Sequence, residues 1–290
     1  MSLKKVTHLL PAALVNMDGF PVRQAIPTQK VQQVDPFLLL HHAAVKPLYG
    51  RPARSQGVGP HPHRGFYPVT FVVEGEVHHR DSRGNSQVAK TGDVQWMHAG
   101  RGIVHSERPS EKLVETRGRQ EIIQLWINSP ASRKMNQPDY QHLSETEMPM
   151  LSSADGKVKS KLVAGKYGGE QGKIRMQSEL LVMWGVAEEA GQVTYSIPQG
   201  FSSCLYLIKG SAKLKGYGLV DKQSLVVFGG EGSEMTISTS VGSQFLLLSG
   251  KPIGEKIVQQ GPYVMNSETE ILEAIRDYQM GKMGILIEED

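Results

Sequence analysis

Short runs of β-branched and aromatic residues, separated by glycine-containing turns, recur along the chain from residue 69 onward. In the first half these apolar runs cover 69–73, 76–80, 94–97, 103–107 and 121–128. In the second half they cover 192–197, 203–209, 212–216, 223–228, 233–238 and 244–248. Short strands at such regular spacing, with turn signals between them, predict an all-β protein of the sandwich or barrel type.

A segment with weak apolar periodicity separates the two strand series. It is richer in Pro, Ser, Gly and charged residues, as connectors are. We therefore expect a first domain at 1–140, a connector at 141–172 and a second domain at 173–290. An apolar triplet, a charge and a glycine at 71–75 (FVVEG) recur at 206–210 (YLIKG), which indicates a duplication.

The end of the chain carries a helix signal. The sequence SETE at 267–270 is a capping box, and Gly281 is a suitable end for the helix that it opens. The pattern predicts a short C-terminal helix whose apolar face is formed by Ile271, Leu272, Ile275 and Tyr278.

Composition narrows the class of protein. The 290 residues are 39% hydrophobic and 21% charged, which is typical of a globular protein with a buried core. The formal charge of +3 is spread along the chain, so charge indicates neither direct nucleic-acid binding nor a membrane partner. Cys204 is the only cysteine and lies in an apolar run, which predicts a buried thiol and favours a cytoplasmic location.

Two pairs of residues with metal-binding side chains stand at strand spacing. His61 and His63 are two residues apart, as are His105 and Glu107, and in an extended segment that spacing points both side chains to one face. A lone histidine usually has a surface or packing role, but two such pairs on adjacent strands favour chelation. The sequence therefore predicts one mononuclear metal site in the first domain.

The types of donor atom limit which metals the predicted site can bind. Three imidazoles and a carboxylate, without thiolate, exclude a cysteine-type zinc site and resemble a non-haem Fe(II) site with one ligand more than the facial triad. Nickel, manganese, copper and zinc remain open. All ten histidines lie at or before His142, so the second domain has no histidine with which to repeat the site, and we expect one divalent transition metal per chain.

The remaining histidines and aromatic residues carry weaker signals. His78 and His79 are neighbours, as are His41 and His42, so at most one of each pair can face a barrel interior. For residues near the predicted site, core packing competes with a role in substrate binding. The candidate pocket residues are Phe66, Trp96 and His98.

Three segments together resemble the signature of the pirin family of bicupins: 61–66 (HPHRGF), 92–97 (GDVQWM) and 99–107 (AGRGIVHSE). The resemblance extends to 35–40, 124–128 and 261–266, and covers essentially the whole chain. It implies two cupin-type β-barrels in tandem. It also implies iron in the first barrel, held by His61, His63, His105 and Glu107, and a second barrel without metal.

The resemblance further implies two functions. One is quercetin 2,3-dioxygenase activity, with a flavonol and dioxygen as substrates and release of carbon monoxide; in this interpretation Glu107 is both a ligand and the base that takes the flavonol 3-hydroxyl proton. The other, known in eukaryotic members, is regulation through protein partners without turnover. A sugar-modifying or storage cupin is disfavoured by the signature. The chain departs from the family at His41, Tyr67 and His98, which bears on the substrate rather than on the metal.

Overall fold

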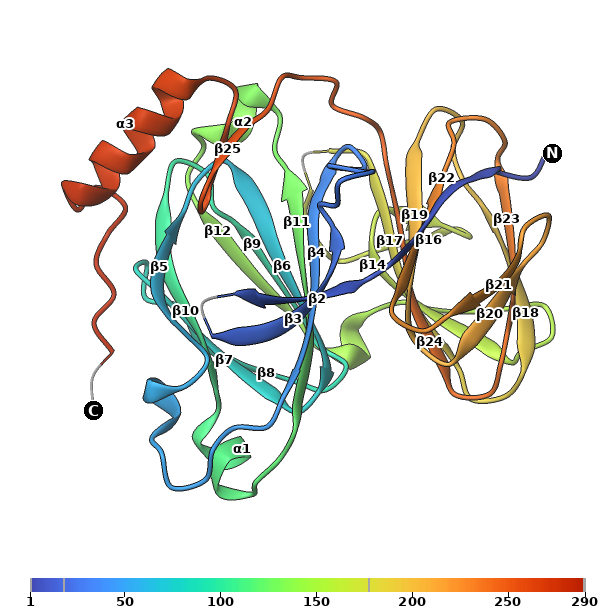
Figure 1. Ribbon diagram of the computed structural model, residues 1–290, viewed down its shortest axis with the longest axis horizontal. Coiled ribbons are helices and arrows are strands. Elements are labelled where there is room, and N and C mark those ends of the chain that lie inside the picture. The colour runs from blue at the N-terminus through green and yellow to red at the C-terminus, as the bar shows by residue number, and fades with distance from the viewer. Residues whose placement is uncertain (1, 18, 177, 289–290) are drawn as a thin grey trace. The chain divides into compact units, whose positions relative to one another are not determined.

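The computed structural model describes residues 2–17, 19–176 and 178–288, and it divides into two compact units (Figure 1). One unit comprises residues 16–22, 39–145 and 253–290; we call it the first barrel. The other comprises 1–15, 23–38 and 146–252; we call it the second barrel. Each unit is built from antiparallel strands, which confirms the all-β prediction.

Two large sheets form the body of the first barrel. The four-stranded sheet has the order β5 (Val58–His63), β10 (Ile103–Pro109), β7 (Glu76–Asp81), β8 (Ser86–Lys90). The seven-stranded sheet has the order β12 (Asp139–Leu143), β9 (Val94–His98), β6 (Phe66–Glu74), β11 (Gln120–Asn128), β4 (Phe37–Val45), β3 (Phe20–Ile26), β2 (Ala13–Met17). The connections contain the short helices η1 (Ala53–Ser55), α1 (Glu111–Glu115), α2 (Ala131–Lys134) and η2 (Glu145–Glu147).

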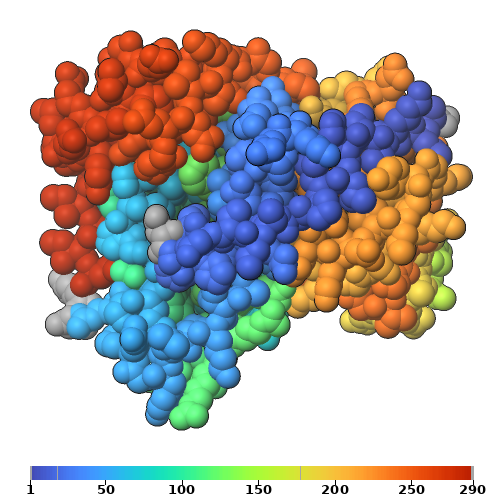
Figure 2. All heavy atoms as spheres, viewed as in Figure 1, coloured from blue at the N-terminus to red at the C-terminus, as the bar shows by residue number. Residues whose placement is uncertain are grey.

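The C-terminal segment packs on the first barrel. It forms β25 (Val258–Gln260), β26 (Tyr263–Met265) and α3 (Glu268–Gln279), shown in red in Figure 2. Ser267 caps α3 by accepting a hydrogen bond from the Glu270 N–H, as the capping box predicts. Ile271 packs in one apolar cluster with Val104 of β10. Leu272, however, is 65% exposed, so the prediction that it belongs to the apolar face is wrong.

The second barrel repeats this arrangement. Its seven-stranded sheet has the order β1 (Val6–Pro11), β22 (Ser224–Phe228), β19 (Ser202–Lys209), β24 (Ser243–Gly250), β17 (Leu180–Ala187), β14 (Val158–Ala164), β13 (Met150–Ser152). Its four-stranded sheet has the order β18 (Gly191–Ser196), β23 (Glu234–Thr239), β20 (Ser211–Leu214), β21 (Gly218–Asp221). A small pair, β15 (Lys166–Tyr167) and β16 (Glu170–Gln171), extends from the loops. Cys204 is buried in β19, as predicted.

The shared topology supports the duplication that the repeated pentapeptide indicates. Gly75 lies between β6 and β7, and Gly210 lies between the corresponding strands β19 and β20. Both glycines have positive φ, at 85° and 75°, and a Cβ at either position would collide with a neighbouring segment of its own barrel. The same backbone bend therefore joins the two sheets in each unit.

Neither unit is one continuous stretch of the chain, as the domain boundaries predicted from the sequence assume. The segment 141–172, expected as a connector, contains β13 and β14 of the second barrel. Residues 1–15 belong to the second barrel and residues 253–290 to the first. These placements depend on long-range strand pairing and packing, which local patterns do not reveal. Within the described part of the chain, no helix has the length and apolar character needed to cross a bilayer.

Candidate metal centre

Three histidine side chains converge in the first barrel. One ring nitrogen from each of His61, His63 and His105 lies within 4.8 Å of the other two, and the Nε2 atoms of His61 and His63 are 3.0 Å apart. The antiparallel pairing of β5 with β10 produces this group, because it sets His61 directly opposite His105. The structure thus brings three of the four predicted ligands together.

The outward nitrogens of His61 and His63 meet carbonyl oxygens. His61 Nδ1 lies 2.8 Å from the Gly59 oxygen, and His63 Nδ1 lies 3.3 Å from the Pro262 oxygen. Since a carbonyl can only accept a hydrogen bond, each Nδ1 carries the proton and each neutral ring has a bare Nε2. A bulge places Gly59 for this role, because β5 has one more residue than β10 between the two neighbouring register pairs.

The bare nitrogens fit a metal ion. Two Nε2 lone pairs face each other at 3.0 Å with no proton to share, and His105 Nε2 is buried without a hydrogen-bond partner among the described residues. An unsatisfied buried acceptor costs about 1–3 kcal/mol, so this cluster is unfavourable unless a cation binds it. Neutral imidazoles whose other nitrogens are hydrogen-bonded outward are the form in which histidines bind metals in proteins.

Burial keeps these histidines neutral. It lowers the pKa of His63 and His105 well below the usual value, and it also lowers the pKa of His61. For His61 the hydrogen bond to Gly59 and the charge of Glu107 oppose the effect. All three rings therefore present lone pairs at neutral pH without having to release a proton first.

Glu107, two residues after His105, is half-buried and held by Thr70. The Thr70 hydroxyl lies 2.6 Å from Glu107 Oε1 and 2.7 Å from Gln124 Oε1, both of which are acceptors. One hydroxyl proton cannot serve both oxygens at once, and the charged carboxylate of Glu107 is the stronger acceptor. Glu107 is outside the tight three-histidine group, but its second carboxylate oxygen, Oε2, has no hydrogen bond within the described structure.

Aromatic rings lie beside the histidines. The ring centroid of Phe66 is 5.0 Å from that of His63, and Trp126 is 5.4 Å from His63 and 4.3 Å from Phe66. Trp126 was not among the pocket residues predicted from the sequence. Its position follows from the pairing of β11 with β6, which sets it opposite Pro68, two residues from the Thr70–Gln124 pair on the same face.

The two other pocket candidates lie elsewhere on β9. Gln95 pairs with Thr70, so it is Gln95 that shares the Thr70 face, while Trp96 and His98 alternate to the other face. Trp96 is fully buried opposite Val69, and His98 stacks on Tyr67 with ring centroids 4.4 Å apart. The structure therefore places Phe66 beside His63, whereas Trp96 and His98 lie on the opposite face of the sheet.

The structure also shows how the adjacent histidines of the two predicted pairs are placed. On β7 the buried residues alternate as Val77, His79 and Asp81, so His79 faces inward and reaches His105, whereas His78 faces outward. The apolar residue Val77 is the sequence signal that could have determined this. At the other pair, His42 is bonded to the buried Glu121, with Nε2 and Oε1 2.9 Å apart.

Among its described residues, the second barrel has no comparable set of donors. Matching Gly210 to Gly75 and following the strand registers gives the counterparts of His61, His63, His105 and Glu107, in that order, as Tyr195, Ile197, Met235 and Ile237. All four counterparts are buried in one apolar cluster. This agrees with the absence of histidine from the second half of the sequence.

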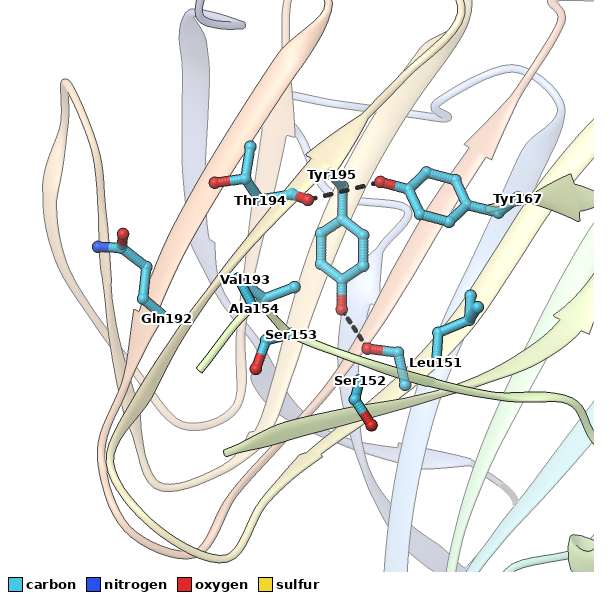
Figure 3. A pocket seen from close by; sticks show the side chains of 10 residues that line it. Leu151, Ser152, Ser153, Ala154, Tyr167, Gln192, Val193, Thr194 and Tyr195 are labelled. Carbon is cyan, nitrogen blue, oxygen red and sulfur yellow. Dashed lines mark hydrogen bonds between the residues drawn. The ribbon is translucent and has the colours of Figure 1, made fainter. Parts of the chain in front are cut away.

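A pocket beside this cluster has a different character (Figure 3). The Tyr195 hydroxyl is 2.6 Å from Ser160 Oγ, and the Tyr167 hydroxyl is within 3.4 Å of the Thr194 carbonyl. The lining contains no histidine, cysteine or carboxylate. It offers hydroxyl groups and apolar surface rather than metal ligands.

Comparisons with known proteins identify the family of the chain. The chain matches the family model Pirin over residues 19–127 and the model Pirin C-terminal cupin domain over residues 183–284. A Pseudomonas aeruginosa protein named "Putative quercetin 2,3-dioxygenase PA2418" is 38% identical over 91% of this chain and 92% of its own length. Pirin-like protein 2 of Arabidopsis thaliana is 35% identical, over 92% of this chain and 81% of its own. A crystal structure of quercetin 2,3-dioxygenase from Acinetobacter baumannii superposes with a TM-score of 0.90, at 33% identity over 99% of this chain and all of that one.

Proposed function

The chain belongs to the pirin family, whose two cupin barrels it contains, and from that premise we propose that it is a metal-dependent dioxygenase that cleaves a flavonol such as quercetin. The observation that supports this proposal most directly is the buried group of bare histidine nitrogens beside a carboxylate and two aromatic rings. Relatives named as quercetin 2,3-dioxygenases support the choice of substrate.

The proposed cofactor is one divalent transition metal per chain, Fe(II) in the first instance. His61, His63 and His105 would hold it through Nε2, and Glu107 through the oxygen that Thr70 does not engage. A bound Fe(II) supplies a Lewis acid that favours a deprotonated hydroxyl and a redox centre for reaction with dioxygen. Nickel, manganese, copper and zinc are also compatible with this mixed set of nitrogen and oxygen donors.

The chain's own residues bind the substrate and move its proton. The half-buried Trp126 offers an apolar ring against which an aromatic flavonol can pack, and the fully buried Phe66 supports that ring, with centroids 4.3 Å apart. The Glu107 carboxylate accepts the proton of the 3-hydroxyl, while the hydrogen bond from Thr70 keeps it oriented. In the overall reaction both oxygen atoms of dioxygen enter the ring-opened product, and one ring carbon leaves as carbon monoxide.

The proposal is tested by supplying quercetin to iron-loaded protein and measuring oxygen consumption and carbon monoxide release, with metal-stripped protein as the control. Glu107→Gln keeps the size of the side chain and one oxygen donor but removes the proton acceptor. We expect its turnover per bound iron to fall by roughly a hundredfold or more. His63→Ala should instead lose activity in proportion to lost iron.

Two results would contradict the proposal in different ways. If the fully loaded Gln variant is as fast as the parent, Glu107 is a ligand and not the base. If the fully loaded parent consumes no oxygen with quercetin or related enols, the dioxygenase proposal fails. The alternative function, a metal-containing regulatory protein that acts through protein partners without turnover, then becomes the better hypothesis.

A further inference from the structure

The outward hydrogen bond of His105 differs in kind from those of His61 and His63. The other two rings face carbonyl oxygens, which fix the proton on Nδ1 unconditionally. His105 Nδ1 faces another ring nitrogen, Nδ1 of His79, at 3.4 Å. An imidazole nitrogen can donate or accept, so His79 alone does not determine which nitrogen of His105 carries the proton.

The far side of His79 removes this ambiguity. His79 Nε2 lies 3.1 Å from Asp81 Oδ2, and both side chains are almost fully buried. An ionised carboxylate can only accept, so His79 carries its proton on Nε2 and presents a bare Nδ1 to His105. His105 must then donate from its own Nδ1, which leaves its Nε2 bare on the side of the metal group.

We call Asp81 and His79 together the Asp81–His79 arm. Both of its members are held in place by their surroundings. Asp81 Oδ1 accepts the backbone N–H groups of Arg83 and Asn85, and Oδ2 also accepts the Asn85 side-chain amide. The His79 ring stacks on Tyr140 with centroids 4.2 Å apart and planes 11° apart. The hairpin turn at 81–85 therefore fixes the carboxylate, and the stack fixes the plane of the ring between Asp81 and His105.

We propose that Asp81 and His79 are positioning residues that hold His105 in the tautomer able to bind the metal. The inference rests on the proposed metal site but not on the dioxygenase activity. Without the arm, the His105 proton can move to Nε2, where it occupies the position that a ligand lone pair must have. Loss of such outer partners typically weakens metal binding by roughly tenfold to a hundredfold.

One substitution should reverse the direction of both hydrogen bonds in the arm, from His79 to Asp81 and from His105 to His79. In Asp81→Asn the amide oxygen should take the Oδ1 place, because two backbone N–H groups point at it, and the Asn85 side-chain amide, which now donates to Oδ2, must turn its oxygen to that place. The amide NH2 then takes the Oδ2 place and donates to His79 Nε2. His79 must carry its proton on Nδ1 and donate to His105, whose own proton is forced onto Nε2. His79→Phe preserves the stack on Tyr140 but removes the arm altogether.

The first measurement uses metal-free protein. Ring-nitrogen chemical shifts from ¹⁵N NMR distinguish the two neutral tautomers of His105. We expect the Nδ1–H form in the parent and the Nε2–H form in Asp81→Asn. A purely structural role for Asp81 would not reverse the tautomer. An unchanged Nδ1–H form in a folded Asp81→Asn protein would overturn the proposal.

The second measurement is the dissociation constant for Ni(II), obtained by competition with a chelator. We expect Asp81→Asn and His79→Phe each to weaken binding by roughly tenfold to a hundredfold. The double variant should be no weaker than His79→Phe, because Asp81 acts through His79. The matched control is His78→Gln on the outward face of β7, where His78 bonds to Ser86, and its affinity should equal that of the parent.

The two proposals fail separately in this design. Parent protein that binds Ni(II) no better than His105→Ala would disprove the metal site itself. Parent protein that binds well, with Asp81→Asn binding equally well, would disprove only the positioning role. Effects of the two substitutions that simply add would show that Asp81 does not act through His79.

Discussion

Substitution of Lys134 would test how the C-terminal segment supports the metal centre. Its side chain is 1% exposed, and Nζ donates to the Gly65 carbonyl at 2.8 Å, Asn128 Oδ1 at 2.7 Å and the Val264 carbonyl at 2.8 Å. Val264 lies two residues after Pro262, whose carbonyl holds His63 Nδ1. One buried ammonium thus fixes both the start of β6 and the strand β26, which directly follows the turn that contains Pro262.

Lys134→Met is the informative change, because it keeps the length of the side chain and removes the three donors. Each buried oxygen left without a donor costs about 1–3 kcal/mol. Part of that cost is offset because the variant no longer buries a charge; this burial is what lowers the pKa of Lys134 to about 8. We expect a net loss of about 3 kcal/mol in the free energy of unfolding, within the range for breaking a buried charged network.

Denaturant unfolding and chelator competition for Ni(II) would measure the two effects on the same variant. Lys112→Met is the control, since Lys112 is 74% exposed and lies 3.7 Å from Glu76, and it should change stability by at most about 0.5 kcal/mol. Lys134→Met should also weaken metal binding, because the Pro262 carbonyl loses its support. A stability loss below about 1 kcal/mol, or an affinity equal to that of the control, would refute this account.

Three further expectations concern the site and its surroundings. Elemental analysis should find one tightly bound transition metal per chain, and His105→Ala should lose most of it while remaining folded; two tightly held ions would contradict the single site. Thr70→Val should weaken Ni(II) binding by roughly tenfold through loss of a hydrogen bond to a charged group, whereas Thr194→Val in the second barrel should leave it unchanged. Burial would raise the pKa of Asp93, but hydrogen bonds from His142 and two backbone N–H groups hold it below its usual value. Its contribution is therefore fully present above about pH 4 and lost as the pH falls through the lower folded-state pKa, so Asp93→Asn should cost about 1 kcal/mol at pH 7 and progressively less as the pH falls below about 4 in unfolding experiments.

The strands were predictable where the cause is local. The run at 69–73 falls within β6 and that at 203–209 within β19, because β-branched and aromatic residues between glycine turns favour strands whatever their partners are. The strand β1 was not predicted. It is recognisable as a strand through its pairing with β22, more than 200 residues away, and a local pattern contains no such information. The same limitation applies to α3, whose existence its capping box predicts but whose packing against Val104 it does not.

The site residues also divide into those that a local pattern orients and those whose position depends on the register between strands. Spacing of two residues was enough to orient His61 with His63, because the alternation of a strand is a local property. Register between strands decided the rest. Thr70 lies beside Gln124 because β6 and β11 pair at that position, and Trp126 follows from the same register. Glu107 reaches Thr70 from β10, in the other sheet of the barrel. His79 was ambiguous beside His78 until the burial of Val77 fixed the direction of alternation on β7.

The two barrels together show what the metal donors cost the fold. The scaffold is the same in both, but four register positions contain histidines and a glutamate in one and buried apolar side chains in the other. Apolar side chains at these positions stabilise a barrel by burial, whereas bare nitrogens without a cation destabilise it. Because the second barrel folds with the apolar set, the architecture does not require a metal. Chelation should therefore leave the first barrel folded with a modest loss of thermal stability, set by the binding free energy alone. Complete unfolding on removal of the metal would show instead that the first barrel, unlike its duplicate, depends on the ion for its structure.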